Sequence, residues 1–411
     1  MSVVPPTVSK EISPAETPYS ISERPPVIVI GGGANALSIA RSLGRAGIQV
    51  WALNYDYSPV RYSRFAQWLS LAGKSQGKSA WADFLLGSSS DHLKGSVIIP
   101  ASDDALELLI EHYTKLKRRF RLDLFVPDAH ASMLNKLKTY QAATRCGVPT
   151  PKFWLVDSIS SVTKLREELV FPLLVKPLYS HRFVATFGVK FLVAENFEQL
   201  MSAWEKLDEE HEVMLVEKIP GPDGQLCSYY TYIDDNGKHL FQFTKRIIRR
   251  FPPEMGVACR HVTDHIPELV EPATKLFAEV GLRGLANVEF KLDPRDGMLK
   301  LIECNARITA ANILLDRCGY DLAYFLYQRV CEGDTPRFRD YQDDVYLWNP
   351  VDDLRAFLQL RSRGELSLGD WISSISKTNV TLQIFHWSDP LPSWMNTWHR
   401  LCRALTRKVH G

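Results

Sequence analysis

Residues 287–307, NVEFKLDPRDGMLKLIECNAR, contain the pattern that decides the fold of this chain. Two apolar runs flank the turn-forming stretch Asp293-Pro-Arg-Asp-Gly297, which predicts a β-hairpin. Side chains two apart on a strand face the same way, so Glu303 and Asn305 share a face. The hairpin brings Glu289 of the first strand beside them.

The chemistry of these three side chains predicts a metal site. Glu289, Glu303 and Asn305 offer two carboxylates and an amide oxygen, which are the hard ligands that Mg²⁺ prefers when it bridges nucleotide phosphates. The alternative is a solvated strand face with surface ion pairs. Glu303 follows the apolar pair Leu301-Ile302, which favours the metal site.

Two lysines precede this hairpin in places that suit phosphate binding. Lys136 opens a predicted helix, and Lys176 ends the apolar strand 172–176 and is followed by Pro177. Each lysine alone is typical of a solvated surface. Taken with the metal site, they predict cations that contact nucleotide phosphates.

The order Lys136, Lys176-Pro177, Glu217-Lys-Ile-Pro-Gly221, Glu289 and Glu303-x-Asn305-x-Arg307 resembles the ATP-grasp superfamily, of the carboxylate–amine ligase type. The resemblance covers residues 27 to about 330. The stretch from Phe243 to Pro253 is most similar to D-aspartate ligase and to uncharacterised carboxylate–amine ligases.

The resemblance implies a role for each matching residue. Lys136 and Lys176 contact the phosphates of ATP. Glu217 accepts a hydrogen bond from the adenine amino group, Lys218 and Ile219 pair with the ring through their backbone, and Asp223 or Gln225 reaches the ribose. Glu289 and Glu303 bridge two Mg²⁺ ions, for which Mn²⁺ can substitute, and Asn305 completes one shell. Arg307 steadies the transferring phosphoryl group.

The implied reaction joins a small-molecule carboxylate to an amine, an amino acid by resemblance, through an acyl phosphate. Water must be excluded from such an intermediate, and the segment Tyr179–Gly188, with His181 near the substrate, is the expected lid. Two features depart from the superfamily pattern: this segment contains only one glycine, Gly188, and Asn135 stands where an aspartate commonly precedes the first lysine.

The basic run Lys245–Arg250 allows two interpretations. It is a solvated strand end, or one arginine binds the γ-phosphate or a substrate carboxylate, because a guanidinium pairs with both oxygens of a carboxylate. Relatives favour Arg246 or Arg249 as this catalytic arginine, and the sequence does not choose between them.

The N-terminal glycines carry the rival hypothesis. Gly31-x-Gly33-x-x-Ala36, followed by Asp56 about twenty residues on, fits the dinucleotide fingerprint of an NAD(P)-dependent oxidoreductase. In ATP-grasp proteins the corresponding loop helps to hold the non-nucleotide substrate, which implies substrate contacts at Gly33, Ala34, Asn35 and Asp103. A third hypothesis is a non-catalytic nucleotide-binding protein.

The expected architecture is α/β and α+β: an ATP-grasp fold with an N-terminal Rossmann-like domain and a C-terminal appendage. We predict a disordered leader, the Rossmann-like domain, the small and the large ATP-grasp subdomains and a helical appendage, at residues 1–26, 27–132, 133–212, 213–332 and 333–411.

The composition of the chain limits the kinds of molecule that it is expected to bind. A formal charge of +2 argues against a nucleic-acid footprint, and scattered cysteines with no membrane-spanning run predict a cytoplasmic enzyme. A homodimer is left open. The last helix, 393–409, combines apolar residues at helical spacing with Arg400, Arg403, Arg407 and Lys408; we expect it to dock on the body or on another subunit rather than on a membrane surface.

Overall fold

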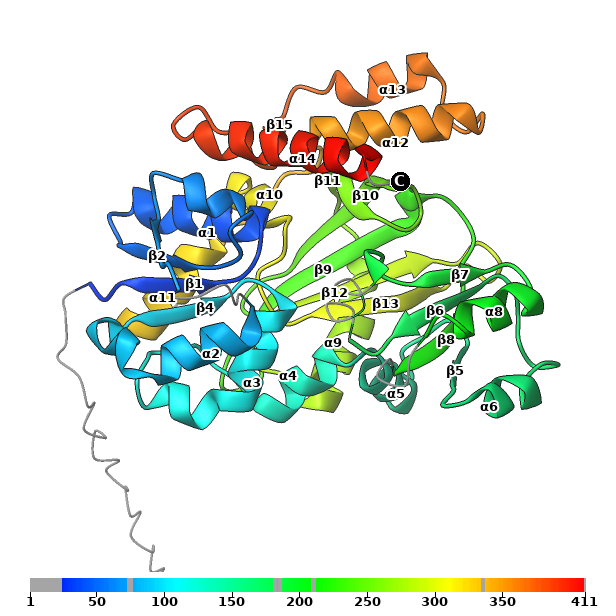
Figure 1. Cartoon of the computed structure of the whole chain (residues 1–411), viewed down its shortest axis with the longest axis horizontal. Helices are drawn as coiled ribbons and strands as arrows, with labels where there is room; N and C mark the ends of the chain where they lie inside the picture. Colours follow the sequence, from blue (N-terminus) through cyan, green and yellow to red (C-terminus); the bar gives the residue numbers. More distant parts are fainter. Residues whose placement is uncertain are drawn as a thin grey trace, which may run out of the picture.

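The computed structural model describes residues 24–71, 77–179, 183, 187–207, 212–333 and 337–409. Within these ranges the chain forms a four-stranded N-terminal sheet, a second four-stranded sheet and a seven-stranded sheet. Figure 1 shows the N-terminal sheet on one side of the molecule, the smaller antiparallel sheet on the other and the long central strands between them.

The N-terminal sheet is parallel, with the strand order β3-β2-β1-β4. Alternation along β1 divides its core: Val27 and Val29 pack with α1, whereas Ile28 and Ile30 pack with α2 and α3. The elements of this region are β1 (Val27–Ile30), α1 (Ala34–Arg45), β2 (Val50–Leu53), η1 (Pro59–Tyr62), β3 (Gln67–Trp68), α2 (Lys78–Leu86), η2 (Ser88–Leu93), β4 (Val97–Pro100) and α3 (Asp103–Lys117).

The turn between β1 and α1 requires glycine. Gly31 and Gly32 have φ values of +68° and +84°, and a Cβ atom on Gly31 would lie 2.1 Å from the Oγ atom of Ser102. Gly33 differs, because nothing lies within 4 Å of the position of its Cβ atom. The first two glycines therefore serve the close approach of β1 to the start of α3.

Two helices and the smaller antiparallel sheet follow. The helices are α4 (Pro127–Leu134) and α5 (Lys136–Arg145), and the sheet has the order β5-β8-β6-β7. Its elements are β5 (Phe153–Leu155), α6 (Ile159–Lys164), β6 (Leu173–Pro177), β7 (Leu192–Ala194), α8 (Phe197–Trp204) and β8 (Val213–Glu217). The predicted large subdomain begins at residue 213, whereas β8 pairs with β5 and β6 and therefore belongs to the smaller sheet.

The seven-stranded sheet has the order β13-β12-β9-β10-β11-β14-β15. The predicted hairpin forms its edge as β12 and β13, paired antiparallel. The further elements are η3 (Asp223–Gln225), β9 (Leu226–Ile233), β10 (Phe243–Phe251), β11 (Val257–Thr263), η4 (Pro267–Leu269), α9 (Val270–Val280), β12 (Gly284–Leu292), β13 (Leu299–Asn305), α10 (Asn312–Arg317) and α11 (Leu322–Glu332).

The C-terminal region is not a purely helical appendage. Its strands β14 (Tyr346–Trp348) and β15 (Val380–Leu382) extend the seven-stranded sheet, with β14 antiparallel to β11 and parallel to β15. The helices α12 (Pro350–Ser362), α13 (Leu368–Ile375) and α14 (Leu391–Val409) lie above this part of the sheet in Figure 1. In the part of the chain that the structure describes, no helix is long and apolar enough to span a membrane.

A buried ion pair ties this region to the N-terminal sheet. The Nε atom of Arg41 in α1 donates to the Oδ2 atom of Asp389 at 2.9 Å, and both side chains are almost fully buried. The Oγ atom of Ser63 donates to the same oxygen at 2.7 Å. The segment that enters α14 is therefore held in place by the N-terminal part of the chain.

Candidate active site

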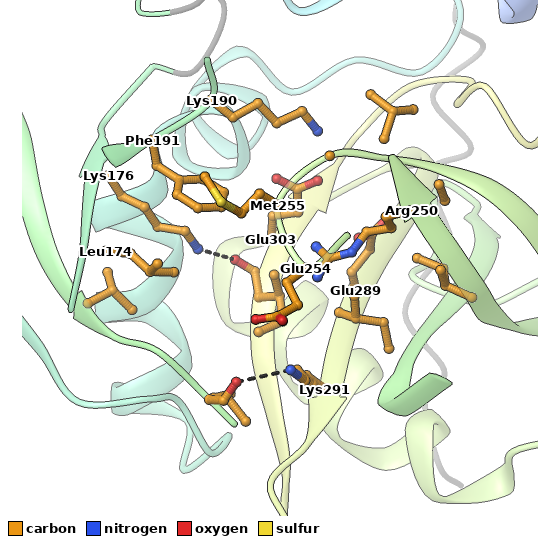
Figure 2. A pocket seen from close by; sticks show the side chains of 18 of the residues that line it. Leu174, Lys176, Lys190, Phe191, Arg250, Glu254, Met255, Glu289, Lys291 and Glu303 are labelled. Carbon is orange, nitrogen blue, oxygen red and sulfur yellow. Dashed lines mark hydrogen bonds between the residues drawn. The ribbon is translucent and has the colours of Figure 1, made fainter. Parts of the chain in front are cut away.

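A cavity lies between the smaller antiparallel sheet and the seven-stranded sheet; we call it the inter-sheet cavity. Figure 2 shows Lys176, Lys190 and Phe191 on one side of it, and Glu289, Lys291 and Glu303 on the β12–β13 hairpin on the other. Both walls carry ionisable side chains, and apolar residues such as Leu174 and Val216 complete the lining.

The two predicted metal ligands from the hairpin face each other. Glu289 and Glu303 are cross-strand partners in the register of β12 and β13, and both line the cavity. Two residues further along this strand pair, Asn305 is the partner of Asn287. The Nδ2 atom of Asn305 donates to the Oδ1 atom of Asn287 at 3.3 Å. Asn305 therefore continues the face of Glu303, although it is not among the residues that line the cavity.

The environment treats the two carboxylates differently. Burial and the charge of Glu303 raise the pKa of Glu289. Burial would also raise the pKa of Glu303, but Lys136, Lys190 and Lys176 outweigh it and lower the pKa well below its usual range. Glu303 is thus an ionised carboxylate held by lysines, and Glu289 is a carboxylate whose charge is not fully compensated.

Lys136 is positioned by the start of α5. The side chain of Asn135 caps this helix by accepting a hydrogen bond from the backbone N–H of Lys138 at 3.0 Å. The Nζ atom of Lys136 then reaches the Oε2 atom of Glu303 at 3.2 Å. Asn135, which departs from the superfamily pattern, retains the capping role that an aspartate would have.

Lys176 lies on β6 and is buried. Its Nζ atom donates to the Oη atom of Tyr140 and to the carbonyl oxygen of Ile302, both at 3.4 Å. Burial, followed by the charge of Lys136, lowers the pKa of Lys176 to about 7. Lys176 therefore makes only long hydrogen bonds in the ligand-free protein. A bound anion would raise its pKa and restore its positive charge.

An irregularity in β10 decides which arginine faces the cavity. The register between β10 and β11 shifts between Ile247 and Arg249 and again between Arg249 and Arg250. This interruption breaks the alternation of side chains, so Lys245, Ile247 and Arg250 line the cavity. Sequence reasoning favoured Arg246 or Arg249, and neither is among its lining residues.

Both of those arginines are engaged elsewhere. Arg249 forms a buried ion pair with Asp353 of α12, at 2.6 Å from Nε to Oδ1. Arg246 pairs with Asp264 at 2.7 Å and donates to the carbonyl oxygen of Gly224. Arg249 therefore connects β10 with α12, and Arg246 lies outside the inter-sheet cavity.

The predicted adenine-binding segment lies at one end of the cavity. Glu217, Lys218 and Ile219 all line it. The carboxylate of Glu217 is buried and forms an ion pair with Arg295, and its Oε2 atom accepts a hydrogen bond from the backbone N–H of Lys152 at 3.3 Å. An adenine amino group would therefore share this carboxylate with Arg295.

The two residues predicted for the ribose lie elsewhere among the described residues. Asp223 is buried, and its Oδ1 atom accepts from the Nε atom of Arg250 at 2.8 Å. It also accepts from the backbone N–H groups of Arg250 and Glu254. Gln225 places its Oε1 atom against Gly221. Neither residue lines the inter-sheet cavity, and Asp223 instead orients Arg250.

Arg307 contacts the N-terminal part of the chain at the start of α3. The Nε atom of Arg307 donates to the Oδ1 atom of Asp103, the first residue of α3, at 2.6 Å. The Nδ2 atom of Asn35 donates to the carbonyl oxygens of Ala101 and Ile308, at 2.5 and 3.0 Å. Asn35 thus joins the β1–α1 turn to the residue that follows Arg307.

Two of the remaining predicted substrate residues, Gly33 and Ala34, lie at the start of α1. Both are partly exposed, and the backbone N–H of Gly33 donates to the Oδ1 atom of Asn35 at 2.9 Å. His181 lies outside the described residues. Asp56, the ribose acid of the dinucleotide hypothesis, is exposed and pairs with Arg61 at 2.6 Å.

The donor set fits a hard divalent cation. Glu289 and Glu303 present carboxylate oxygens to the cavity. The amide nitrogen of Asn305 is the atom that donates to Asn287, so the oxygen of its amide is the one suited to a cation. Within the described residues no cluster of three or more His, Cys, Asp or Glu side chains suited to a metal is found. This set is two carboxylates and an amide, typical of Mg²⁺ sites that also use substrate phosphates and water.

Sequence reasoning missed several cations at this site. Lys190, Lys245 and Lys291 line the cavity together with Arg250. On a regular strand Lys245 and Arg250 would face opposite sides, because they are an odd number of positions apart. The irregularity in β10 lets both line the cavity, and the sequence does not reveal it. Lys291 could have been found, since it follows Glu289 by two positions on the same strand and therefore shares its face.

Comparison with known proteins gives the class of this architecture. Residues 260–335 match the family model described as "Carbamoyl-phosphate synthase L chain, ATP binding domain". The biotin carboxylase domain of the 2-oxoglutarate carboxylase of Hydrogenobacter thermophilus, solved with MgADP and bicarbonate, aligns with a TM-score of 0.61 at 17% identity, over 78% of this chain and 73% of that one. The chain therefore has the ATP-grasp fold.

Two relatives are ligases by name. The D-aspartate ligase of Enterococcus faecium is 23% identical over 359 residues, which is 82% of this chain and 85% of the relative. The structure of an L-amino acid ligase from Bacillus licheniformis aligns with a TM-score of 0.55 at 18% identity, over 76% of this chain and 75% of that one. The similarity to D-aspartate ligase therefore extends over most of both chains.

Proposed function

We propose that this protein is an ATP-dependent ligase that phosphorylates a small-molecule carboxylate and couples the acyl phosphate to an amine, releasing ADP and phosphate. The observation that carries the proposal is the pairing of Glu289 with Glu303 across the β12–β13 hairpin, facing lysines on the opposite wall. Opposed carboxylates and cations in one cavity suit a magnesium-bound polyphosphate and little else.

Different lining residues would bind the adenine ring and the phosphates of ATP. Lys218 and Ile219 would take the adenine ring beside Glu217, and Lys136, Lys176, Lys245 and Arg250 would take the phosphates. Glu289, Glu303 and Asn305 would hold Mg²⁺, which supplies Lewis-acid stabilisation of the phosphate oxygens when bound. Asp223 keeps Arg250 in place through the ion pair between them.

The carboxylate substrate would lie near Arg307. In the first step of the proposed reaction, an oxygen of the substrate carboxylate attacks the γ-phosphorus of ATP. The bond between this phosphorus and ADP breaks, and an acyl phosphate forms. The nitrogen of the amine then attacks the acyl carbon, phosphate leaves, and the amine loses a proton. Arg307 can neutralise charge on the phosphoryl group, and Asp103 holds its guanidinium in one orientation. No protein nucleophile is required.

An amino acid is the favoured partner, because the relatives named above are ligases of D-aspartate and of L-amino acids. We place the reaction in the cytoplasm, where ATP and free amino acids occur together. The first pair of substrates to test is therefore D-aspartate with a range of amines and carboxylates.

Thermal unfolding with Mg-ATP, with Mg²⁺ alone and with NADPH is the test of the site. A ligand that binds the native state raises the unfolding midpoint. We expect Mg-ATP to stabilise the wild type and Glu303→Ala to lose that gain, whereas the control Glu271→Ala, an exposed residue of α9, keeps it. Stabilisation by NADPH in place of Mg-ATP would instead favour the hypothesis of an NAD(P)-dependent oxidoreductase that binds its cofactor at the N-terminal glycines.

Turnover is measured by ADP release with pairs of carboxylates and amines. Amine-dependent ADP release by the wild type, absent in Glu303→Ala, is the expected result. A wild type that binds Mg-ATP but releases no ADP with any pair would favour the non-catalytic nucleotide-binding hypothesis.

A further inference from the structure

Helix α14 rests on the molecule by a side that combines Pro392 and Met395 with polar residues. The Oη atom of Tyr62 lies 3.3 Å from the Nε2 atom of His399, and Arg400 pairs with Asp352 of α12. Ser393 and Asn396 line a groove that α14 forms with α12 and β15. An amphipathic helix normally docks by its most apolar side, whereas the largest apolar side chains of α14 take no part in this contact.

The apolar side of α14 faces solvent. Leu391, Trp394 and Trp398 follow one another at positions i, i+3 and i+7, which places them on one face of the helix. Trp394 is 64% exposed and Trp398 is 61% exposed. Trp387, just before the helix, is 86% exposed. Three exposed indole rings within twelve positions are more than the scattered apolar residues of an ordinary surface.

This exposure is not the result of a loosely attached segment. Asp389 lies between Trp387 and the helix and is itself 2% exposed, because Arg41 and Ser63 hold its carboxylate. The buried ion pair fixes the chain immediately before α14, and Arg400 anchors the middle of the helix on α12. The exposed tryptophans therefore lie between two fixed points, Asp389 before the helix and Arg400 at its middle, or directly beside them.

The neighbouring helix α12 adds apolar residues at the same spacing. Val351, Leu354 and Leu358 are all exposed and again follow at i, i+3 and i+7. Val351 also lines the groove that separates α12 from α14, and Figure 1 shows the two helices side by side. Two adjacent helices thus expose apolar residues on either side of one groove.

The charge of this layer is basic. The sequence of α14 contains Arg400, Arg403, Arg407 and Lys408 and no acidic residue. Three acidic residues of the surrounding layer are already engaged by arginines: Asp352 by Arg400, Asp353 by Arg249 and Asp389 by Arg41. The exposed tryptophan and aliphatic side chains therefore belong to two helices of which α14 is basic by its sequence.

We propose that α14 and the exposed face of α12 form a docking surface for an anionic lipid bilayer. Tryptophan rings favour the boundary between head groups and acyl chains, and basic side chains favour anionic head groups. A second copy of this chain fits less well, because two α14 helices would bring like charges together. The enzyme would thus be a peripheral one that lies on the membrane without crossing it.

Sedimentation of the full-length chain with lipid vesicles tests this proposal. We expect binding to vesicles that contain phosphatidylglycerol, little binding to vesicles of phosphatidylcholine alone, and release by high salt. Trp394→Ser combined with Trp398→Ser should weaken binding by at least about tenfold, since two large apolar side chains no longer leave water. The matched control is Leu155→Ser, an exposed apolar residue of β5, which should bind as the wild type does.

Two further measurements keep the outcomes apart. The unfolding midpoint of the double variant should equal that of the wild type, because the replaced side chains are exposed, and light scattering should show the same molecular mass for both. Failure of the wild type to bind anionic vesicles would overturn the proposal. A wild-type dimer that the double variant converts to a monomer would overturn it too, in favour of a second copy as the occupant.

Discussion

Glu289 of β12 lies directly opposite Glu303 of β13, so two carboxylates face each other across a strand pair inside a largely buried cavity. Like charges in this arrangement destabilise a sheet. Lys136 compensates Glu303 through a direct contact, whereas Glu289 is raised in pKa by burial and by Glu303. A bound divalent cation would relieve this repulsion.

Replacing Glu289 by glutamine should stabilise the ligand-free protein and abolish its response to Mg-ATP. A carboxylate with a raised pKa in the folded state causes a loss of stability as the pH rises from its ordinary pKa through the folded one. Glutamine avoids it, so the unfolding midpoint should rise by roughly 1–2 °C at neutral pH. Scanning calorimetry at several pH values measures this; an equal midpoint gain at acidic pH would contradict the explanation.

Binding of Mg-ATP should take up protons through Lys176. Its pKa is lowered to about 7 in the ligand-free protein, and nearby phosphate charges would raise it. Between about pH 7 and 9 the neutral lysine therefore becomes charged on binding. Titration calorimetry in buffers of different ionisation enthalpy counts the protons. Lys176→Met should reduce the uptake, and Lys275→Met, at an exposed ion pair of α9, should not.

The same lysine gives the ligand-free protein a dependence on pH. A lysine whose folded pKa lies below its unfolded value contributes stability that is present above the unfolded value and is lost as the pH falls through the folded value. The contribution of Lys176 should therefore fall as the pH decreases from about 10 to about 7, and a Lys176→Met protein should lack this part of the pH profile.

The three arginines of β10 should separate in their effects. Arg250→Ala should weaken Mg-ATP binding about tenfold or more, because it removes a cavity cation. Arg249→Ala leaves Asp353 buried without its partner and should cost about 3–5 kcal/mol of unfolding free energy. Arg246→Ala removes a partly exposed ion pair and should cost under about 1 kcal/mol. Urea unfolding and nucleotide titration of all three variants would show whether this order holds.

Arg307→Lys should separate turnover from nucleotide binding. Lysine keeps the positive charge but loses the planar guanidinium that pairs with Asp103. We expect ADP release to fall about 100-fold or more, with Mg-ATP stabilisation retained. An unchanged rate would remove Arg307 from the reacting centre, and a loss of both would point to a general disruption of the site.

Two glycines of the β1–α1 turn should respond in opposite ways to alanine. Gly31→Ala places a Cβ atom 2.1 Å from the Oγ atom of Ser102 at a φ of +68°, which should destabilise the protein by more than about 1 kcal/mol. Gly33→Ala meets nothing within 4 Å and should be tolerated. Thermal unfolding of both variants is the measurement; equal effects would mean that the turn relaxes around the added atom.

The parts that the sequence predicts correctly are those set by local pattern. The alternation of residues along β12 and β13, with a turn-forming stretch between them, was sufficient to place Glu289 beside Glu303. An apolar strand that ends in Lys176, taken with the metal site, predicts a cation beside the phosphates, and Lys176 does line the cavity. Both inferences need only the side-chain period of a strand and the chemistry of its last residues.

The parts that the sequence does not predict depend on contacts between distant segments. Arg249 pairs with Asp353 and Arg250 with Asp223, and no local pattern distinguishes these partners. The register irregularity in β10 places Arg250 in the cavity lining, whereas relatives favour Arg246 or Arg249. The membership of β8 in the smaller sheet likewise follows from pairing with β5 and β6, which lie earlier in the chain.

The ion pair between Arg41 and Asp389 has a consequence for synthesis of the chain. The helix α1 is made early, yet its buried arginine finds its carboxylate only when residue 389 has left the ribosome. Until then water takes the place of these partners, because the hydrogen bonds of the guanidinium all go to Ile384 and Asp389. This side of α1 is therefore completed only at the end of synthesis, and a nascent chain that stops before residue 384 should leave α1 more open to proteases than the full chain does.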